Sequence, residues 1–412
     1  MIFIRIPIDN LIPFKYTGNI AIGKSCARNR VYHTLSRLDE EKAMRETVAG
    51  FHHAVENRHE YAQEWKTRTG GKALGYLCTL APEEILYAAG ILPVRIIGGH
   101  EPQDVTQSHI FSMFCSYCQD TLAQGLLGKY NYLDGIVFAH CCPHIRQTYE
   151  SWKQHIPTAF SHLLWVPSQT ESLSAHTFFT AQVQEFKEAV EKWIEGPIPT
   201  DRLKKTIETY NLNRRLLLQA YGLRKEDPPA ISGTAMMEMV LSSALMDKKD
   251  HNSLLQEFLS QPTQSNGSGI RLMVLGSESD DVELIRLIES LGSVVVMEDN
   301  CIGNRYFMNE ISLKGDPVST IADRYLEKPP CPLRDIAVRR RANYLLELAK
   351  EYRAEGAIFL RQKFCDPHAF EIPLVSKIFL EQGLPNLVLE LDTTTPHGQY
   401  RTRVEAFLEM LQ

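Results

Sequence analysis

The stretch Asp-Gly-Ile-Val-Phe-Ala-His-Cys-Cys-Pro-His, residues 134–144, carries the pattern that decides the fold. Its apolar run, residues 134–140, predicts a buried β-strand, and Pro143 suits the first position of a following helix. Residues 293–299 and 357–362 repeat the apolar run. Continuous apolar strands that alternate with helical segments are typical of parallel sheets covered by helices. The sequence therefore predicts an α/β fold.

Cysteines follow each of these three runs. Cys142 and Cys301 come two residues after their runs, and Cys365 comes three residues after its run. Cys115 lies at the predicted start of another helix. Ligands of open α/β sheets bind outside the carboxyl ends of the strands, where helix N-termini also converge. These four thiols are therefore candidates for one functional site.

The predicted elements divide the chain into four segments. In order these are an N-terminal extension with a helix (1–70), a first α/β domain (71–170), a helical insert with a linker (171–262) and a second α/β domain (269–412). The N-terminal helix is expected to begin at a capping box near Ser36 and to end near Trp65. The Gly-, Ser- and Pro-rich composition of residues 261–269 indicates the linker.

The expected strands and helices alternate within both α/β domains. In the first domain the strands are 73–77, 92–97, 134–140 and 159–166, and the helices are 82–90, 112–127 and 143–155. In the second the strands are 270–275, 293–299, 357–362 and 386–391, and the helices are 280–291, 333–353, 368–382 and one from 401. Such alternation implies parallel pairing with right-handed crossovers.

Composition excludes several classes of function. A chain of 412 residues with 44% hydrophobic residues can fill more than one core. The net charge of −6 is spread along the sequence, so we expect no nucleic-acid partner, which would need clustered Lys and Arg. The run of three arginines at 339–341 is interpreted as a solvated helix face or a contact with another protein chain.

The N-terminal residues and the apolar stretches indicate a cytoplasmic protein. The first 18 residues carry Arg5 and Asp9 and have no cleavage site for a signal peptidase. Apolar stretches fall short of the roughly 18 residues that a membrane helix needs. We therefore expect no membrane association. In a reducing compartment the nine cysteines favour metal binding or catalysis over disulfides, although a packing role fits some of them, Cys78 above all.

The cysteine spacing leaves several chemistries open. Cys115 and Cys118 form a Cys-x-x-Cys pair, which together with Cys141, Cys142 and His144 is compatible with a zinc site or a redox pair. A centre that used both Cys142 and Cys365 would instead bridge the two α/β domains. Cubane iron–sulfur clusters take cysteine thiolates and suit such an interdomain position.

Other side chains near these cysteines are candidates for further roles. His140 and His144 are candidate proton donors, with a hydrogen-bonded structural role as the alternative. Arg305 follows Cys301 in the loop 298–305 and is a candidate substrate-binding cation, with a surface ion pair as the alternative.

Several short motifs of this chain occur together in an order that resembles the 2-hydroxyacyl-CoA dehydratase / benzoyl-CoA reductase family. They are Gly75-Tyr76 with 82–85, Cys115 with 133–135, Cys142 with Ile145-Arg146, 298–306, 362–367, and 398–399 with 402–407. The resemblance runs from about residue 40 to the C-terminus. It implies two Rossmann-like domains facing each other, with a [4Fe-4S] cluster between them.

By position, the resemblance implies that Cys115, Cys142 and Cys365 hold the cluster. Pro143 departs from the family pattern, which often has Asp after the middle ligand. Cys118 or Cys301 is a candidate fourth ligand, which would turn a substrate-binding cluster into an electron relay.

Residues 69–76 and 91–94 look most like the smaller cluster-bearing subunit of ATP-dependent benzoyl-CoA reductases. The resemblance implies one-electron reduction of an aromatic acyl-CoA, with ferredoxin as the upstream donor and a homologous second cluster-bearing subunit. The chain has no GxxxxGK[ST] loop, so we expect it to bind no nucleotide and to depend on ATP-hydrolysing activator subunits. The alternatives are an (R)-2-hydroxyacyl-CoA dehydratase subunit and a non-catalytic relay or structural subunit.

Overall fold

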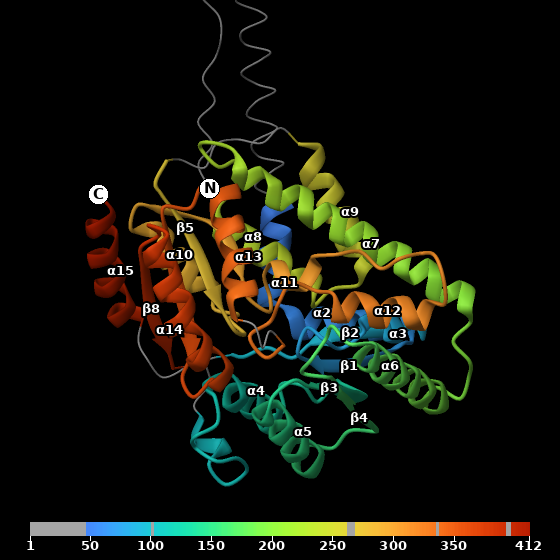
Figure 1. Cartoon of the computed structure of the whole chain (residues 1–412). Helices are drawn as coiled ribbons and strands as arrows, with labels where there is room; N and C mark the ends of the chain where they lie inside the picture. Colours follow the sequence, from blue (N-terminus) through green and yellow to red (C-terminus); the bar gives the residue numbers. More distant parts are fainter. Residues whose placement is uncertain (1–46, 100–102, 262–267, 335–337, 393–396) are drawn as a thin grey trace, which may run out of the picture. The chain divides into compact units, whose positions relative to one another are not determined.

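The computed structural model describes residues 47–99, 103–261, 268–334, 338–392 and 397–412 (Figure 1). All of them fall within one unit, Met44–Gln412. Two parallel sheets with flanking helices make up its framework. The predicted α/β class with two Rossmann-like domains is thereby confirmed. The predicted domain boundaries stay a prediction.

The first sheet has the strand order β2-β1-β3-β4, and all its pairs are parallel. Its strands are β1 (Lys72–Leu77), β2 (Ile91–Arg95), β3 (Gly135–His140) and β4 (Phe160–Trp165). Leu74 pairs with Gly135 where β1 and β3 meet. The chain passes from β1 to β2 on one side and returns to β3 on the other, so the strand order reverses between β1 and β3.

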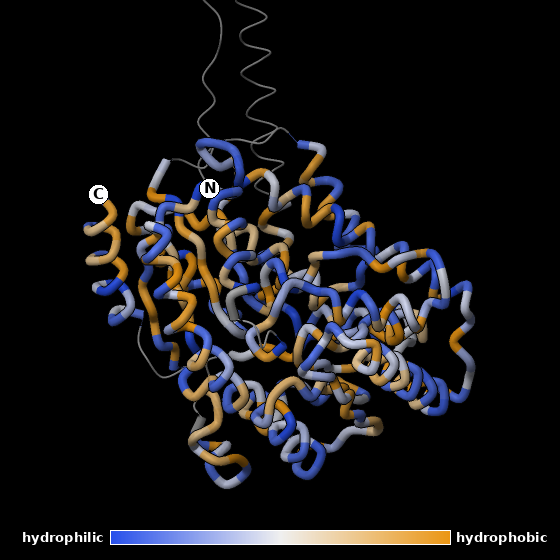
Figure 2. The backbone as a smooth tube through the Cα atoms, viewed as in Figure 1, coloured by the Kyte–Doolittle hydropathy of each residue, from blue (hydrophilic) through white to orange (hydrophobic). Residues whose placement is uncertain are grey.

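The second sheet repeats this topology in the order β6-β5-β7-β8, again with parallel pairs. Its strands are β5 (Ile270–Gly276), β6 (Ser293–Asp299), β7 (Gly356–Gln362) and β8 (Asn386–Leu391). All seven residues of β6 are buried, as expected for a strand covered on both faces. The order of this sheet reverses between β5 and β7. Figure 2 shows hydrophobic residues along its strands and hydrophilic residues along the outer helices.

Helices connect the strands of each sheet. Those of the first half are α3 (Glu83–Ala88), α4 (Ser116–Leu126) and α5 (Pro143–His155). Those of the second half are α10 (Val282–Ser290), α11 (Asn304–Phe307), α12 (Pro317–Leu326), α13 (Val338–Glu351), α14 (Asp366–Glu381) and α15 (His397–Leu411). The bounds of α5 match the prediction at both ends, and Pro143 occupies its first turn.

Four long helices lie between the two sheets in sequence, as predicted. They are α6 (Leu173–Trp193), α7 (Thr200–Gly222), α8 (Gly233–Ser243) and α9 (Lys248–Ser260). Buried side chains recur along α6 at the spacing of one helix face, namely Phe179, Val183, Phe186 and Val190. Among the described residues, no helix has both the length and the apolar character needed to cross a membrane.

The predicted N-terminal helix that ends near Trp65 is present in the described residues, but it is interrupted once and ends at Thr69. The described chain is helical over 47–56, turns at Asn57 and continues as α2 (Arg58–Thr69). The side chain of Asn57 donates a hydrogen bond to the carbonyl oxygen of His53 at 2.9 Å, and such local bonds compete with helix continuation. The predicted capping box at Ser36 lies outside the described residues.

The sequence patterns did not predict the two helices between β6 and α13. The start of α12 nevertheless carries clear sequence signals, because Asp316 caps its N-terminus by accepting from Ser319 N at 2.9 Å and Pro317 follows directly. The chain between α12 and α13 then enters the region where the two sheets meet.

Candidate functional site

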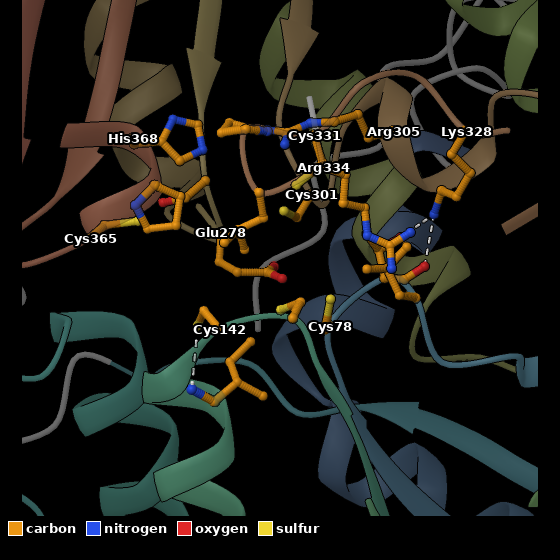
Figure 3. Close-up of a pocket in the computed structure, with 18 of the residues that line it drawn as sticks. Cys78, Cys142, Glu278, Cys301, Arg305, Lys328, Cys331, Arg334, Cys365 and His368 are labelled. Atoms are coloured by element: carbon orange, nitrogen blue, oxygen red, sulfur yellow. Dashed lines mark hydrogen bonds between the residues drawn. The ribbon is translucent and has the colours of Figure 1, made fainter. Parts of the chain in front are cut away.

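Every cysteine of the described residues lines one pocket. The pocket lies where the strand ends of the two sheets meet, and both halves of the chain contribute to its wall. Its thiols are Cys78, Cys115, Cys118, Cys141, Cys142, Cys301, Cys331 and Cys365. Eight thiols in one pocket are not explained by independent packing of each cysteine. Figure 3 shows Cys78 and Cys142 across the pocket from Cys301 and Cys331.

The topology explains why these residues meet. Cys78 and Cys142 follow β1 and β3, between which the order of the first sheet reverses, and Cys365 follows β7 at the corresponding place in the second sheet. Crossover connections leave opposite sides of the sheet at such a point, so a crevice forms there. The prediction that a centre using Cys142 and Cys365 bridges the two halves agrees with this arrangement.

The three predicted cluster ligands share one local structure. Cys115, Cys142 and Cys365 are the N-cap residues of α4, α5 and α14, and all have extended backbone. The backbone N–H of Ile145 donates to Cys142 Sγ at 3.4 Å. A helix N-terminus carries partial positive charge and free N–H groups, which stabilise a thiolate. Each predicted ligand therefore lies at a helix N-terminus that opens on the pocket.

Cys118 lies one turn into α4 and contacts Cys115. The hydrogen bond from Cys118 lowers the pKa of the Cys115 thiol to about 6, and His144 acts in the same direction. The same bond raises the pKa of Cys118, because Cys118 holds the proton that Cys115 accepts. Burial raises the pKa of Cys365. The hydrogen bond within the Cys-x-x-Cys pair thus shifts the pKa values of its two thiols in opposite directions.

The two predicted histidines have different positions. His144 lines the pocket, and its Nδ1 accepts from the backbone N–H of Cys115 at 3.2 Å. In the neutral ring the proton therefore lies on Nε2, which is 3.8 Å from Asp366 Oδ2. His140 is not among the pocket residues of the described chain, and its ring packs on Trp165 at 4.5 Å between centroids. Burial lowers the pKa of His140.

Arg305 also lines the pocket, and the interpretation of it as a surface residue was wrong because only 2% of it is exposed. Its guanidinium donates to the carbonyl oxygens of Gly276 and Asp299, and its Nε lies 3.3 Å from Asp299 Oδ1. Its Nη1 has no hydrogen-bond partner. A buried cation therefore keeps Nη1 unsatisfied beside the thiols.

The interpretation of the arginine run as a solvated face was also wrong for Arg341. This side chain is buried and pairs with Asp299 at 2.7 Å and with Glu371. Arg340 is exposed and pairs with Glu171. Arg341 and Arg305 thus share Asp299, which ties α13 and α11 to the end of β6.

Sequence reasoning missed other charged residues of the pocket wall. Glu278 follows β5 and pairs with Arg95 from the first half, while its Oε2 has no partner. Lys328 donates to the carbonyl oxygen and the hydroxyl of Thr79 at 2.7 and 2.8 Å. Arg334 has an unpaired, buried Nη2. The sequence feature that could have indicated Lys328 and Arg334 is the segment Lys-Pro-Pro-Cys-Pro at 328–332, in which a cysteine lies among prolines.

The arrangement of the donors discriminates between zinc and an iron–sulfur cluster. Among the described residues, no group of three or more His, Cys, Asp or Glu side chains converges so as to hold one metal ion. A single zinc ion needs such convergence, since its thiolate ligands all lie about 2.3 Å from one centre. The thiolates of an iron–sulfur cluster bind different irons and need not converge. The iron–sulfur cluster itself stays a prediction.

A comparison with protein families identifies the family of this chain. Residues 78–411 match the model described as 2-hydroxyglutaryl-CoA dehydratase, D-component. The chain belongs to this family. The match begins at Cys78, so the whole cysteine pocket of this D-component family member lies within the matched residues. The resemblance stated from the sequence motifs is confirmed.

Curated relatives of this D-component family member are enzyme subunits. The chain is 27% identical to the (R)-phenyllactyl-CoA dehydratase beta subunit of Clostridium sporogenes, over 88% of this chain and 97% of the relative. It is 28% identical to a benzoyl-CoA reductase subunit of Thauera aromatica, over 79% and 86%. It is 25% identical to (R)-2-hydroxyglutaryl-CoA dehydratase, subunit beta, of Acidaminococcus fermentans, over 83% and 93%. The relatives thus include both dehydratases and a reductase.

Proposed function

We propose that this chain is the cluster-bearing subunit of an ATP-dependent aryl-CoA reductase. Cys115, Cys142 and Cys365 would hold a [4Fe-4S] cluster in the pocket. When bound, the cluster would supply single electrons at low potential, which clusters of this kind reach down to about −700 mV, to reduce the ring of benzoyl-CoA or a related aromatic acyl-CoA. The observation that supports this most is that all three cysteines are helix N-caps opening on one pocket.

The surrounding residues have defined tasks in this proposal. The N-terminal ends of α4, α5 and α14 fix the positions of the three sulfurs at the pocket. Burial of the pocket between the two sheets excludes water from a reactive centre. His144 holds a proton at Nε2, because its Nδ1 accepts from the backbone N–H of Cys115. The neutral ring can donate a hydrogen bond from Nε2, and the proposed role of His144 as a proton donor would require the ring to be protonated on both nitrogens.

The number of thiols that bind the cluster would decide whether it can contact substrate. A dehydratase of this family would need an open coordination position for its 2-hydroxyacyl substrate. Cys118 contacts Cys115, and Cys301 lines the same pocket, so either thiol is available to close that position. A closed cluster would act as an electron relay, whereas three protein ligands would leave a position open for substrate. The names of the relatives from Clostridium sporogenes and Acidaminococcus fermentans favour the alternative, an (R)-2-hydroxyacyl-CoA dehydratase subunit.

The proposal includes partners that this chain needs. The curated relatives are named as single subunits of larger enzymes, so we expect a second cluster-bearing subunit to pair with this chain. ATP-hydrolysing activator subunits, fed by ferredoxin, would deliver the electrons. A relay or structural subunit, whose cluster never contacts substrate, is the alternative from another functional class.

The first test is anaerobic purification of the chain with its partner subunit, followed by iron and sulfide analysis and EPR after reduction. We expect at least about four irons per chain with matching sulfide. Benzoyl-CoA should shift the EPR spectrum, and serine variants of Cys115, Cys142 or Cys365 should lose that signal. Zinc without sulfide would overturn the proposal.

Product analysis distinguishes the reactions. With the activator and ATP present, benzoyl-CoA and phenyllactyl-CoA should be assayed in parallel. A ring-reduced thioester supports the reductase, and loss of water from phenyllactyl-CoA supports the dehydratase. A cluster whose EPR spectrum responds to neither thioester identifies the relay.

A further inference from the structure

Four pocket cysteines have no part in the three-cysteine cluster site or in the Cys-x-x-Cys pair. Cys78, Cys141, Cys301 and Cys331, called here the second thiol set, all line the same pocket. Cys78 is buried, the other three are partly buried, and all four are free cysteines. Their gathering at one place requires an explanation of its own.

The second thiol set comes from loops of both halves of the chain. Cys78 and Cys141 follow β1 and β3, Cys301 follows β6, and Cys331 lies between α12 and α13. Cys78 has a φ of 75°, which side chains other than glycine rarely adopt, and such backbone strain clusters at functional sites. The backbone N–H of Cys301 donates to the carbonyl oxygen of Ser277 at 3.1 Å and so anchors its loop to the neighbouring one.

These four thiols interact with one another. Cys78 and Cys141 form a side-chain hydrogen bond. Cys301 lies close enough to Cys331 and Cys78 for their charges to interact. Cys141 also contacts Cys142, so the second thiol set adjoins the predicted cluster ligands. The thiols of the pocket therefore form a continuous array, in which Cys141 joins the second thiol set to Cys142.

Cations distinguish the second thiol set from the first group. Arg334 interacts with Cys331, Cys78 and Cys141, while Lys328 interacts with Cys78 and Cys301. Arg305 interacts with Cys301 and Cys331. Figure 3 shows Arg305, Arg334 and Cys301 on the same side of the pocket, with Glu278 reaching toward the space between Cys301 and Cys78.

Two of these cations have unsatisfied nitrogens. Arg305 Nη1 and Arg334 Nη2 are buried and have no hydrogen-bond partner. Burying a charged donor without a partner is costly, so native proteins keep such groups where a ligand satisfies them. Positive donors facing a group of thiols fit an anionic, sulfur-ligated occupant. Plain packing of cysteines would not need the cations.

We propose that Cys78, Cys141, Cys301 and Cys331 bind a second iron–sulfur unit next to the one on Cys115, Cys142 and Cys365. Arg305, Lys328 and Arg334 would offset its negative charge. A single ion is a poorer fit, because no three metal-binding side chains of the described chain converge on one point. The inference rests on the pocket being an iron–sulfur site, as in the proposed function, but not on which acyl-CoA is the substrate.

The test counts iron and sulfide in the full chain after anaerobic reconstitution with ferrous iron and sulfide. We expect about eight irons per chain, two units of about four. The double variants C78S/C141S and C301S/C331S remove thiols from opposite walls of the pocket. Both should lower iron to about half and leave an EPR signal that requires Cys115. Ser151→Ala, a buried change in α5 outside the pocket, is the control and should keep the full count.

Each outcome bears on the inference. About four irons, lost on Cys115→Ser and unchanged in both double variants, would overturn the second site and leave the proposed function standing. Absence of iron and sulfide would overturn both. About eight irons that fall to about four in the double variants would support the second site, even if benzoyl-CoA is not reduced. Circular dichroism and thermal unfolding of the cluster-free variants separate ligand loss from misfolding.

A cation variant provides a second measurement that leaves every thiol in place. Arg334→Gln should keep the iron count and move one of two reduction potentials to a more negative value, because a nearby positive charge stabilises the reduced, more negative form of a cluster. Arg361→Gln, which removes a cation that pairs with Glu390 outside the pocket, is the matched control. If Arg334→Gln and Arg361→Gln had the same pair of reduction potentials, the assignment of Arg334 to a second unit would be contradicted.

Discussion

Two buried polar regions of this chain differ in how well their groups are satisfied. The thiol pocket keeps unpaired atoms on Arg305, Arg334 and Glu278. A second region, called here the insert network, lies among α7, α8 and α9 and centres on Asn213 and His251. Both regions are charged or polar and deeply buried. Only the first, among the described residues, combines unpaired charged atoms with a pocket lined by thiols.

The insert network is closed on itself. Asn213 donates to His251 Nδ1 and to Asn252 Oδ1, both at 2.8 Å, and accepts from Ser243 Oγ at 2.7 Å. His251 Nε2 lies 3.0 Å from the carbonyl oxygen of Met239. A buried network in which every polar group has a hydrogen-bond partner helps to specify the fold. Buried polar groups without partners are instead candidates for contacts with a ligand. The comparison teaches that burial alone does not mark a functional site.

The largest effect should come from a predicted cluster ligand. Cys115→Ser should reduce turnover of the reconstituted complex by at least about 100-fold, because even residues that only support metal ligands cost up to that much. The unfolding free energy of the cluster-free chain should change by less than about 1 kcal/mol, as for most substitutions without a structural role. Turnover, iron content and urea unfolding of one preparation measure this. Full turnover with intact iron would remove Cys115 from the site.

In the insert network we expect a substitution to lower the unfolding free energy while iron binding is kept. Asn213→Ala should lower the unfolding free energy by about 2–4 kcal/mol, because it leaves several buried partners unpaired. The folded fraction should still incorporate iron. Urea unfolding of the cluster-free protein gives the magnitude. Gln219→Ala removes an exposed side-chain amide from the same helix, and this control should change the unfolding free energy by less than about 0.5 kcal/mol. An Asn213→Ala protein as stable as the parent would refute the structural role of the network.

The pH dependence of stability should sharpen the contrast. Burial lowers the pKa of His251 to about 3, so the unfolded state, in which this histidine has its ordinary pKa of 6.5, binds more protons between these values. The neutral His251 therefore contributes its full share of the folding stability above pH 6.5. This contribution is lost as the pH falls, by up to about 1.4 kcal/mol per pH unit. Urea midpoints between neutral and mildly acidic pH should show a steeper fall in the parent than in His251→Gln. Equal slopes would contradict a buried, neutral His251.

The smallest effect on stability should come from an unsatisfied cation of the pocket. Arg334→Gln should change the unfolding free energy of the cluster-free chain by less than about 1 kcal/mol, because the buried Nη2 that it removes has no partner. Urea unfolding without and with reconstituted iron measures this change. A loss of several kcal/mol in the cluster-free chain would place Arg334 with the structural groups.

Much of the candidate site is visible in the sequence. Apolar runs and capping signals are local patterns, and they predict Cys142, Cys301 and Cys365 at strand ends and Cys115 at a helix start. The same reasoning misses Lys328, Cys331 and Arg334. They enter the pocket on a loop between α12 and α13, and no periodic pattern marks a loop residue that reaches a distant site.

Burial is the property that the sequence predicts least well. The sequence left a surface ion pair as the alternative for Arg305 and favoured a solvated face or a protein contact for Arg341. Both side chains are buried around Asp299 at the end of β6. The sequence also favoured a packing role for Cys78, although this residue lines the pocket. Charged side chains are exposed in most contexts, so sequence alone favours the wrong answer where distant partners compensate their charge.

The sequence by itself determined the alternation of strands and helices and the place of most cysteines on them, because hydrophobic periodicity, Pro143 and capping residues act over a few positions. Only the tertiary structure decided that eight thiols share one pocket and that Arg305, Lys328 and Arg334 lie beside four of them. These contacts join residues far apart in the chain. They depend on how the two sheets pack where the strand order of each reverses. Local sequence patterns do not predict that packing.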